Sequence, residues 1–181
     1  MGNFYVNFTV HGSSGQRVVQ ALGERAAIVT PSRSGCVVAF DQEADSQDLS
    51  VLAAVGRGLS AQTSGPVLAL LNHDDDVLFY ELSVDGTLLD QYESALEGTR
   101  APTGGDAALL CDVFGAGDVQ AVAQVLGAPR LGPGGYLFAV QRHDALVRAL
   151  HLSTYAVGFG YRDVSQGNLP DGLDDADLLW T

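Results

Sequence analysis

The sequence predicts an α+β protein whose first half is one antiparallel sheet with two helices packed against it. Three observations support this fold class. Apolar and polar residues alternate over 4–11, as in a strand with one buried face. The segment 67–71 is apolar at every position, which indicates a strand covered on both faces. Asp85-Gly86 separates two strand-like segments and favours a two-residue type I′ turn.

The order of the elements predicted in the first half indicates a specific sheet topology. We expect a strand at 4–11, a helix at 14–22 capped from the Gly12-Ser13-Ser14 turn, strands at 26–30 and 35–40, a helix capped by Asp45 or Ser46 and ending near 64, and a strand at 67–71. This order is the split βαβ arrangement of a ferredoxin-like βαββαβ domain. The hairpin 77–84 and 87–93 extends its sheet to six strands.

The second half reads as mainly helical. The segment 94–105 is rich in Gly, Pro and Thr and predicts a long surface loop. Apolar spacing predicts helices at 106–114, 118–126 and 144–152, one late strand at 155–161, and an irregular tail from 165. We therefore expect a single domain over 1–181, in which 1–93 is the sheet with its helices and 106–181 is an extension.

Charge excludes several classes of function. The chain of 181 residues has a net charge of −13, and its nine basic residues are all arginine. A field of this sign repels phosphate backbones, so nucleic acid is not an expected partner. Without lysine there is neither a Schiff base nor a phosphate-loop lysine. No apolar stretch approaches the roughly 20 residues of a membrane span, and the N-terminus lacks a secretory signal, so we expect a cytoplasmic protein that does not bind membranes.

The two cysteines do not form a recognisable motif. Cys36 and Cys111 have no CxxC neighbour and no histidine at metal-ligand spacing. The simpler interpretation is two buried free thiols, since unpaired cysteine behaves as a small hydrophobe. A disulfide between them stays an open alternative.

The sharpest chemical cluster is His73-Asp74-Asp75-Asp76, directly after the apolar strand. Three carboxylates and an imidazole in a turn can ligate a divalent cation if folding points them the same way. Adjacent residues on a strand point apart, and neither an EF-hand nor an HExxH pattern is present. A solvated turn and an acid/base role are the alternatives, because Asp and Asn favour turns.

A second candidate site is the polar face of the first strand. Tyr5, Asn7 and His11 alternate with apolar residues, and Asn72 would lie nearby if the fourth strand pairs with the first. These residues could line a ligand groove on an open sheet face. The alternative is a face covered by the C-terminal helices, with Tyr5 and His11 hydrogen-bonded inside the interface.

No catalytic residues are assigned. The GxSxG pattern of a serine hydrolase is absent, and the glycine-rich stretches lack the context of a dinucleotide site. Arg142-His143-Asp144 places a base beside an acid, but Asp144 as a helix cap explains the motif.

The segments Met1–Asn7 and Leu71–Asp76 resemble those of a group of uncharacterised bacterial proteins with no known activity. Fainter likenesses cover Arg142–Val147 and Gly158–Tyr161. The resemblance implies a bacterial source and a shared fold, and no mechanism.

Two functions follow from these residues. The leading hypothesis is a non-enzymatic module that binds a protein or small ligand through its sheet face or acidic loops. The alternative is a divalent-metal-binding protein or metal-dependent hydrolase using His73, Asp74, Asp75 and Asp76, where the metal would activate water. A homodimer formed through an exposed sheet edge is compatible with either.

Overall fold

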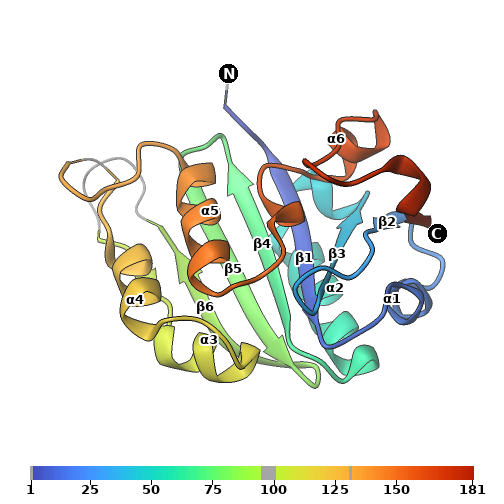
Figure 1. The fold of residues 1–181 in the computed structure, drawn as a ribbon, viewed down its shortest axis with the longest axis horizontal. Helices are drawn as coiled ribbons and strands as arrows, with labels where there is room; N and C mark the ends of the chain where they lie inside the picture. Colours follow the sequence, from blue (N-terminus) through green and yellow to red (C-terminus); the bar gives the residue numbers. More distant parts are fainter. Residues whose placement is uncertain (1, 95–100, 131) are drawn as a thin grey trace.

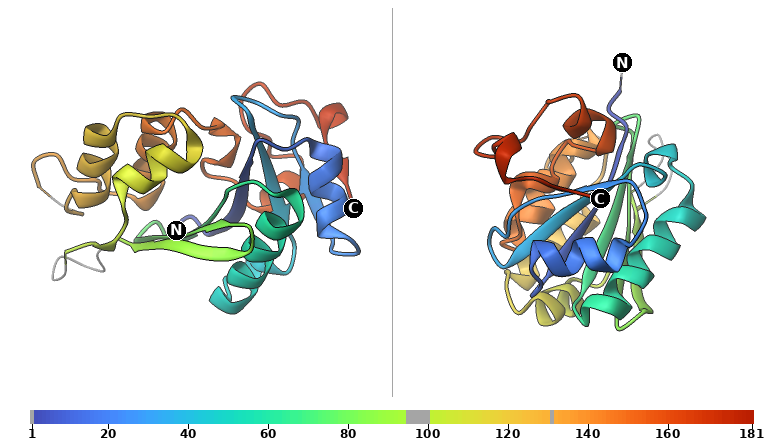
Figure 2. Two further views of the ribbon diagram at one scale, coloured as in Figure 1. Left: turned by 90° about the horizontal axis from the view of Figure 1, so that it is seen from below. Right: turned by 90° about the vertical axis from the view of Figure 1, so that its right-hand side faces the viewer.

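The structure is a computed structural model that describes residues 2–94, 101–130 and 132–181. These residues form an α+β fold in which one antiparallel sheet has helices on both faces (Figures 1 and 2). Its eight strands are β1 (Tyr5–His11), β2 (Ala27–Val29), β3 (Cys36–Asp41), β4 (Val67–His73), β5 (Val77–Val84), β6 (Thr87–Glu93), β7 (Thr103–Gly104) and β8 (Leu179–Trp180). The six α-helices of the described residues are α1 (Gly15–Leu22), α2 (Leu49–Thr63), α3 (Ala107–Phe114), α4 (Val119–Gly127), α5 (Ala139–Ala149) and α6 (Tyr161–Ser165).

β1 lies in the middle of the sheet, between β4 and β3. The complete order is β7-β6-β5-β4-β1-β3-β2-β8, and every neighbouring pair is antiparallel. The β1–β4 register places Tyr5 opposite Asn72 and Asn7 opposite Leu70. Because side chains alternate across a strand, Tyr5, Asn7 and Asn72 share one face of the sheet.

The opposite face packs against α1 and α2. Val6, Phe8 and Val10 of β1 point into this layer, where they are fully buried with residues of both helices. α2 comes very close to the strands at Gly56, where a Cβ would lie 3.0 Å from the Cβ of Ala69. Glycine therefore permits this helix-sheet distance.

The face that carries Tyr5 and Asn7 is covered by the C-terminal half. α3, α4 and α5 pack over β4, β5 and β6, and the segment from the 3₁₀ turn Thr154–Ala156 through α6 to Leu178 packs over β2 and β3 (Figure 2). Both faces of the central strands are thus buried by described residues, so the core has two layers.

Several local predictions for the first half are confirmed. Ser14 caps α1 by accepting from the Arg17 N–H, and the hairpin strands have the expected bounds. Asp85 and Gly86 have φ values of 48° and 77°, as a type I′ turn requires. The expected cap of α2 is wrong, because residues Ala44–Ser46 form a 3₁₀ turn and Asp48 caps the helix instead.

The predictions for the second half need more correction. The expected strand at 155–161 is a 3₁₀ turn followed by the start of α6. The helix expected at 144–152 begins five residues earlier, at Ala139, where the Gln141 side chain accepts from the Phe138 N–H. The expected irregular tail instead contains β8, which pairs with β2 at one edge of the sheet.

The sheet also exceeds the six strands expected. β7 adds a strand beyond β6 inside the segment predicted as a loop at 94–105, of which residues 95–100 lie outside the described part. No helix within the described ranges has the length and apolar character needed to cross a membrane.

Candidate functional site

The turn between β4 and β5 has an unusual backbone. Asp74 and Asp75 have φ values of 54° and 56°, in the left-handed region that Asp and Asn tolerate better than most residues. The Asp76 N–H donates to the His73 carbonyl at 2.9 Å and closes the turn. The run of aspartates therefore has a local structural reason.

His73 is held on the α2 side of this turn. Its Nδ1 lies 2.6 Å from Oε1 of Gln47, whose Nε2 donates to the main-chain carbonyl of Asn72 at 2.8 Å. The Phe4 ring meets the imidazole edge to face, with 5.1 Å between centroids. His73 thus has neutral and aromatic neighbours.

The aspartate side chains have different partners. Asp75 Oδ1 accepts from Asn72 Nδ2 at 2.8 Å, and Asp76 forms an ion pair with Arg130. Asp74 is exposed. Among the residues that the structure describes, no three His, Cys, Asp or Glu side chains are placed to hold a metal ion. Folding therefore does not gather His73, Asp74, Asp75 and Asp76 into a common ligand set.

The polar face of β1 lies inside the protein. The Tyr5 hydroxyl is 2.8 Å from Nδ1 of His143 in α5, and the rings stack with 5.7 Å between centroids. Asn7 Nδ2 donates to the carbonyls of Ala156 at 2.6 Å and Phe159 at 2.9 Å. Described residues therefore cover this face, as the second alternative expected, with Tyr5 hydrogen-bonded inside the interface.

Asn72 and His11 occupy different surroundings on the same face. Asn72 is fully buried beside Tyr5, whereas His11 lies at the far end of β1, partly exposed against the Phe114 ring. The four predicted ligand-binding residues therefore form a buried group of three and one separate histidine. The Oδ1 atoms of Asn7 and Asn72 have no hydrogen-bond partner among the described residues.

Burial keeps the Tyr5–His143 pair neutral. It raises the pKa of Tyr5 above its usual value, although hydrogen bonds from Asn72 and the Gly158 backbone lower it somewhat. It lowers the pKa of His143 to about 3, although the charge of Asp144 acts in the opposite direction. Neither group changes charge near neutral pH, so the pair serves to join β1 to α5.

Three large, exposed apolar side chains belong to the two segments that meet the turn. Phe4, Leu137 and Phe138 are 49%, 52% and 46% exposed. The Ala139 N–H donates to the Asp75 carbonyl at 2.7 Å, and the Asp75 N–H donates to the Asn3 carbonyl at 3.1 Å. The N-terminal segment and the start of α5 therefore both meet the turn. We call this area the turn-end surface and define it as Phe4, His73, Asp74, Asp75, Asp76, Leu137 and Phe138.

Sequence reasoning identified only the acidic part of this surface. Leu137 and Phe138 follow a glycine-rich stretch, in a segment that matches either a short strand or a helix start. Phe4 belongs to an alternating strand, where its position predicts burial. No sequence pattern distinguishes an exposed apolar residue from a buried one, so the exposure of these three residues could be seen only in the structure.

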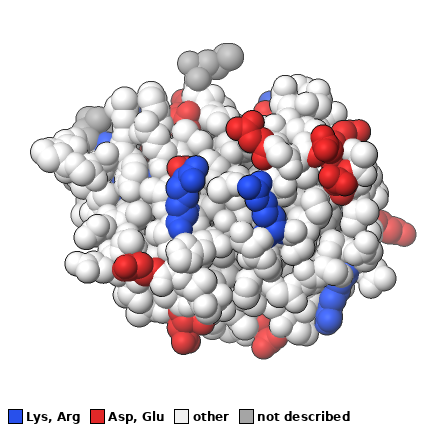
Figure 3. Space-filling model, in the orientation of Figure 1, with Lys and Arg blue, Asp and Glu red and all other residues white. Residues whose placement is uncertain are grey.

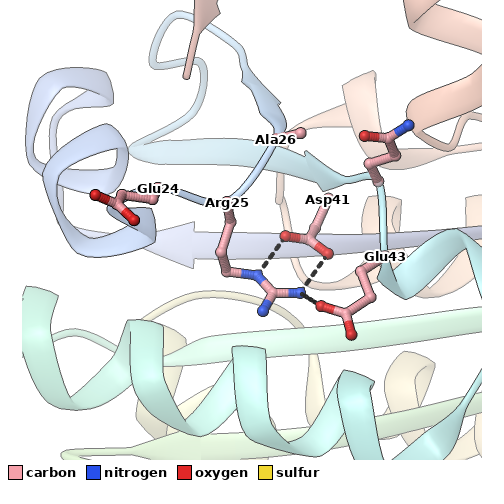
Figure 4. A pocket seen from close by; sticks show the side chains of 6 residues that line it. Glu24, Arg25, Ala26, Asp41 and Glu43 are labelled. Atoms are coloured by element: carbon pink, nitrogen blue, oxygen red, sulfur yellow. Dashed lines mark hydrogen bonds and ion pairs between the residues drawn. The ribbon is translucent and has the colours of Figure 1, made fainter.

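A shallow depression of about 400 Å³ lies at the start of β2, lined by Glu24, Arg25, Ala26, Asp41, Gln42 and Glu43. Arg25 donates to both carboxylate oxygens of Asp41, at 2.6 and 2.8 Å, and to Glu43 at 2.9 Å (Figure 4). The bond to Asp41 raises the pKa of Arg25. Two carboxylates already engage this guanidinium, which makes it an internal ion pair rather than an anion site.

The two thiols are free, but only Cys36 is buried as the simpler interpretation expected, and Cys111 is partly exposed. Cys36 is buried, and burial raises its pKa to about 11, which removes it as a nucleophile at neutral pH.

Comparisons of the chain with models of protein families, with curated proteins and with solved structures found no match. The site must therefore be interpreted from its own geometry.

Proposed function

We propose that this protein is a non-enzymatic binding module that holds a partner protein at the turn-end surface. The observation that carries the proposal is that Phe4, Leu137 and Phe138, each about half exposed, belong to the two segments that meet one acidic turn. Their exposed apolar surface sums to on the order of 300 Å², with Phe4 on one side of the turn and Leu137 and Phe138 on the other.

The other exposed apolar side chains are dispersed. Leu49, Leu89, Val119 and Trp180 belong to α2, β6, α4 and β8, one residue on each element. Single exposed apolar residues are ordinary on protein surfaces. The contrast between four dispersed residues and three gathered at one turn is what singles out the turn-end surface.

The turn-end surface is also held in one conformation before any partner arrives. Backbone bonds from Ala139 and to Asn3, the side-chain bond from Asn72 and the ion pair to Arg130 all meet the 74–76 turn. A surface that is already ordered loses little conformational entropy on binding. This favours recognition of a partner by a rigid contact.

The fold is compatible with this role. We infer that residues 5–73 are a ferredoxin-like βαββαβ unit, because the order β4-β1-β3-β2 with antiparallel neighbours and two helices on one face is the arrangement of that fold. The fold hosts many functions and names none of them. The free thiols of Cys36 and Cys111 support a reducing compartment such as the cytoplasm.

An unbiased selection tests the proposal. Random peptides displayed on phage are selected on the full chain, and bound peptides are then measured against the L137S/F138S variant and against L89S/V119S. The second variant removes two equally exposed apolar residues elsewhere. We expect L137S/F138S to weaken the selected peptides at least tenfold and L89S/V119S to leave them unchanged. Selected peptides that bind L137S/F138S as tightly as the wild type would refute the proposal.

A further inference from the structure

We infer that the turn-end surface takes a short basic segment of a partner chain, in which an aromatic or aliphatic residue lies next to arginine or lysine. This inference rests on the proposed function and adds the chemistry of the partner. It follows from the charge of the surface, from the order of its residues and from its size.

The charge of the surface is negative and only partly compensated. Asp74, Asp75 and Asp76 are consecutive, and Arg130 is the cation that pairs with them among the described residues. Asp74 is exposed to solvent. On the face shown in Figure 3, basic side chains stand singly while acidic ones recur along its margins. With a net charge of −13, the whole molecule attracts a cationic segment.

The same charge argues against a second copy of this chain at the turn-end surface. Two copies meeting there would bring their acidic turns together, and each would carry a net charge of −13. Like charges placed against each other cost several kcal/mol at an interface. A basic partner removes this repulsion and is the occupant that the electrostatics favour.

The apolar residues lie on both sides of the acidic turn. Phe4 contacts His73 on the α2 side, while Leu137 and Phe138 precede Ala139, whose N–H bonds to the turn from the other side. A segment that crosses the turn therefore meets an aromatic ring, carboxylates and then another ring. Arginine suits such a path because its guanidinium both pairs with carboxylates and stacks on aromatic faces.

The size of the surface fits a peptide segment rather than a folded domain. Its apolar area of roughly 300 Å² is well below the roughly 800 Å² that each partner contributes to a standard interface between folded proteins. An extended stretch of a few residues covers such an area. We therefore expect recognition of a linear motif.

Titration with three synthetic peptides, followed by ¹⁵N–¹H NMR of the full chain, tests the inference. The first peptide is Arg-Leu-Arg-Phe-Arg-Leu; the second replaces each Arg with Glu, and the third replaces Leu and Phe with Ser. We expect only the first to shift resonances at 73–76 and 137–139. Its dissociation constant should rise at least tenfold in L137S/F138S and severalfold in D74N, and it should be unchanged in D174N, which removes one exposed carboxylate from the C-terminal tail.

The outcomes separate the two proposals. Equal binding of the Glu peptide at the turn-end surface would overturn the basic partner while leaving the proposed function intact. An equal loss of affinity in D74N and D174N would show attraction to net charge alone and would overturn the inference. Shifts confined to other residues, with no effect of L137S/F138S, would overturn the basic segment as the occupant of this surface, and the phage selection would still decide the function. Binding by none of the three peptides at millimolar concentration would reject the basic motif, and the phage selection would still decide the function.

Discussion

Replacing Arg142 with methionine should be among the most destabilising single substitutions in this protein. Arg142 lies on α5, is 2% exposed and has no carboxylate partner among the described residues. Its guanidinium donates to the carbonyls of Val125 at 2.6 Å and Ala128 at 2.7 Å and to the Tyr92 hydroxyl at 3.0 Å. Those carbonyls lie at the C-terminal end of α4, where the helix dipole favours a cation.

The expected magnitude follows from these contacts. Each hydrogen bond from a charged donor contributes about 1.5–3 kcal/mol, and burying the guanidinium offsets much of the sum. Methionine fills similar space but leaves two buried carbonyls and a hydroxyl without their donor. The guanidinium also lies 5.0 Å from the centroid of the Tyr136 ring, a cation-π contact that methionine loses. We expect a loss of about 3 kcal/mol from the free energy of unfolding.

Urea unfolding followed by circular dichroism measures this change. R148M is the matched control, because Arg148 lies on the same helix but is exposed and paired only with Asp144 four residues away. An exposed pair of this kind contributes little, so R148M should unfold at nearly the wild-type urea concentration. A loss below about 1 kcal/mol in R142M, or equal losses in the two variants, would refute the role of Arg142 as the cation that stabilises the end of α4.

The remaining predictions concern pH and the hairpin. In the folded protein His143 has a pKa of about 3, below its ordinary value of 6.5. Between these two pH values the imidazole is protonated in the unfolded chain but not in the folded protein. The free energy of unfolding therefore falls as the pH decreases through this range. Between pH 6.5 and 5 the wild type should lose up to about 1.4 kcal/mol per pH unit more than H143Q, whose neutral side chain does not titrate; parallel stability curves would contradict this. G86A should lower stability by about 1–2 kcal/mol, because Gly86 has φ +77° and a Cβ there would lie 3.2 Å from that of Ala61. Thermal unfolding checks the latter, with G58A as the control at a helical glycine that has open space around it.

The sequence by itself determined the elements whose cause lies within a few residues. Val6, Phe8 and Val10 alternate with polar residues, which specified a strand and the face that packs against α1 and α2. Ser14 accepts a hydrogen bond from a backbone N–H three residues ahead and so caps α1. Asp85 and Gly86 both tolerate the positive φ values that a type I′ turn requires. The residues of the acidic turn were also predicted as a candidate site, because carboxylates in sequence are visible without coordinates.

Only the tertiary structure decided what those elements contact. Asp45, expected as a cap of α2, instead accepts from the N–H groups of Tyr161 and Arg162, 116 and 117 residues away, at the start of α6 and the last residue of the expected strand. Likewise, β8 forms by pairing with the edge strand β2. Leu137 and Phe138 are exposed because they precede the first residue of α5, Ala139, whose N–H donates to the Asp75 carbonyl. Local sequence rules extend over about one helical turn, whereas these contacts depend on which distant segments the packed sheet brings together.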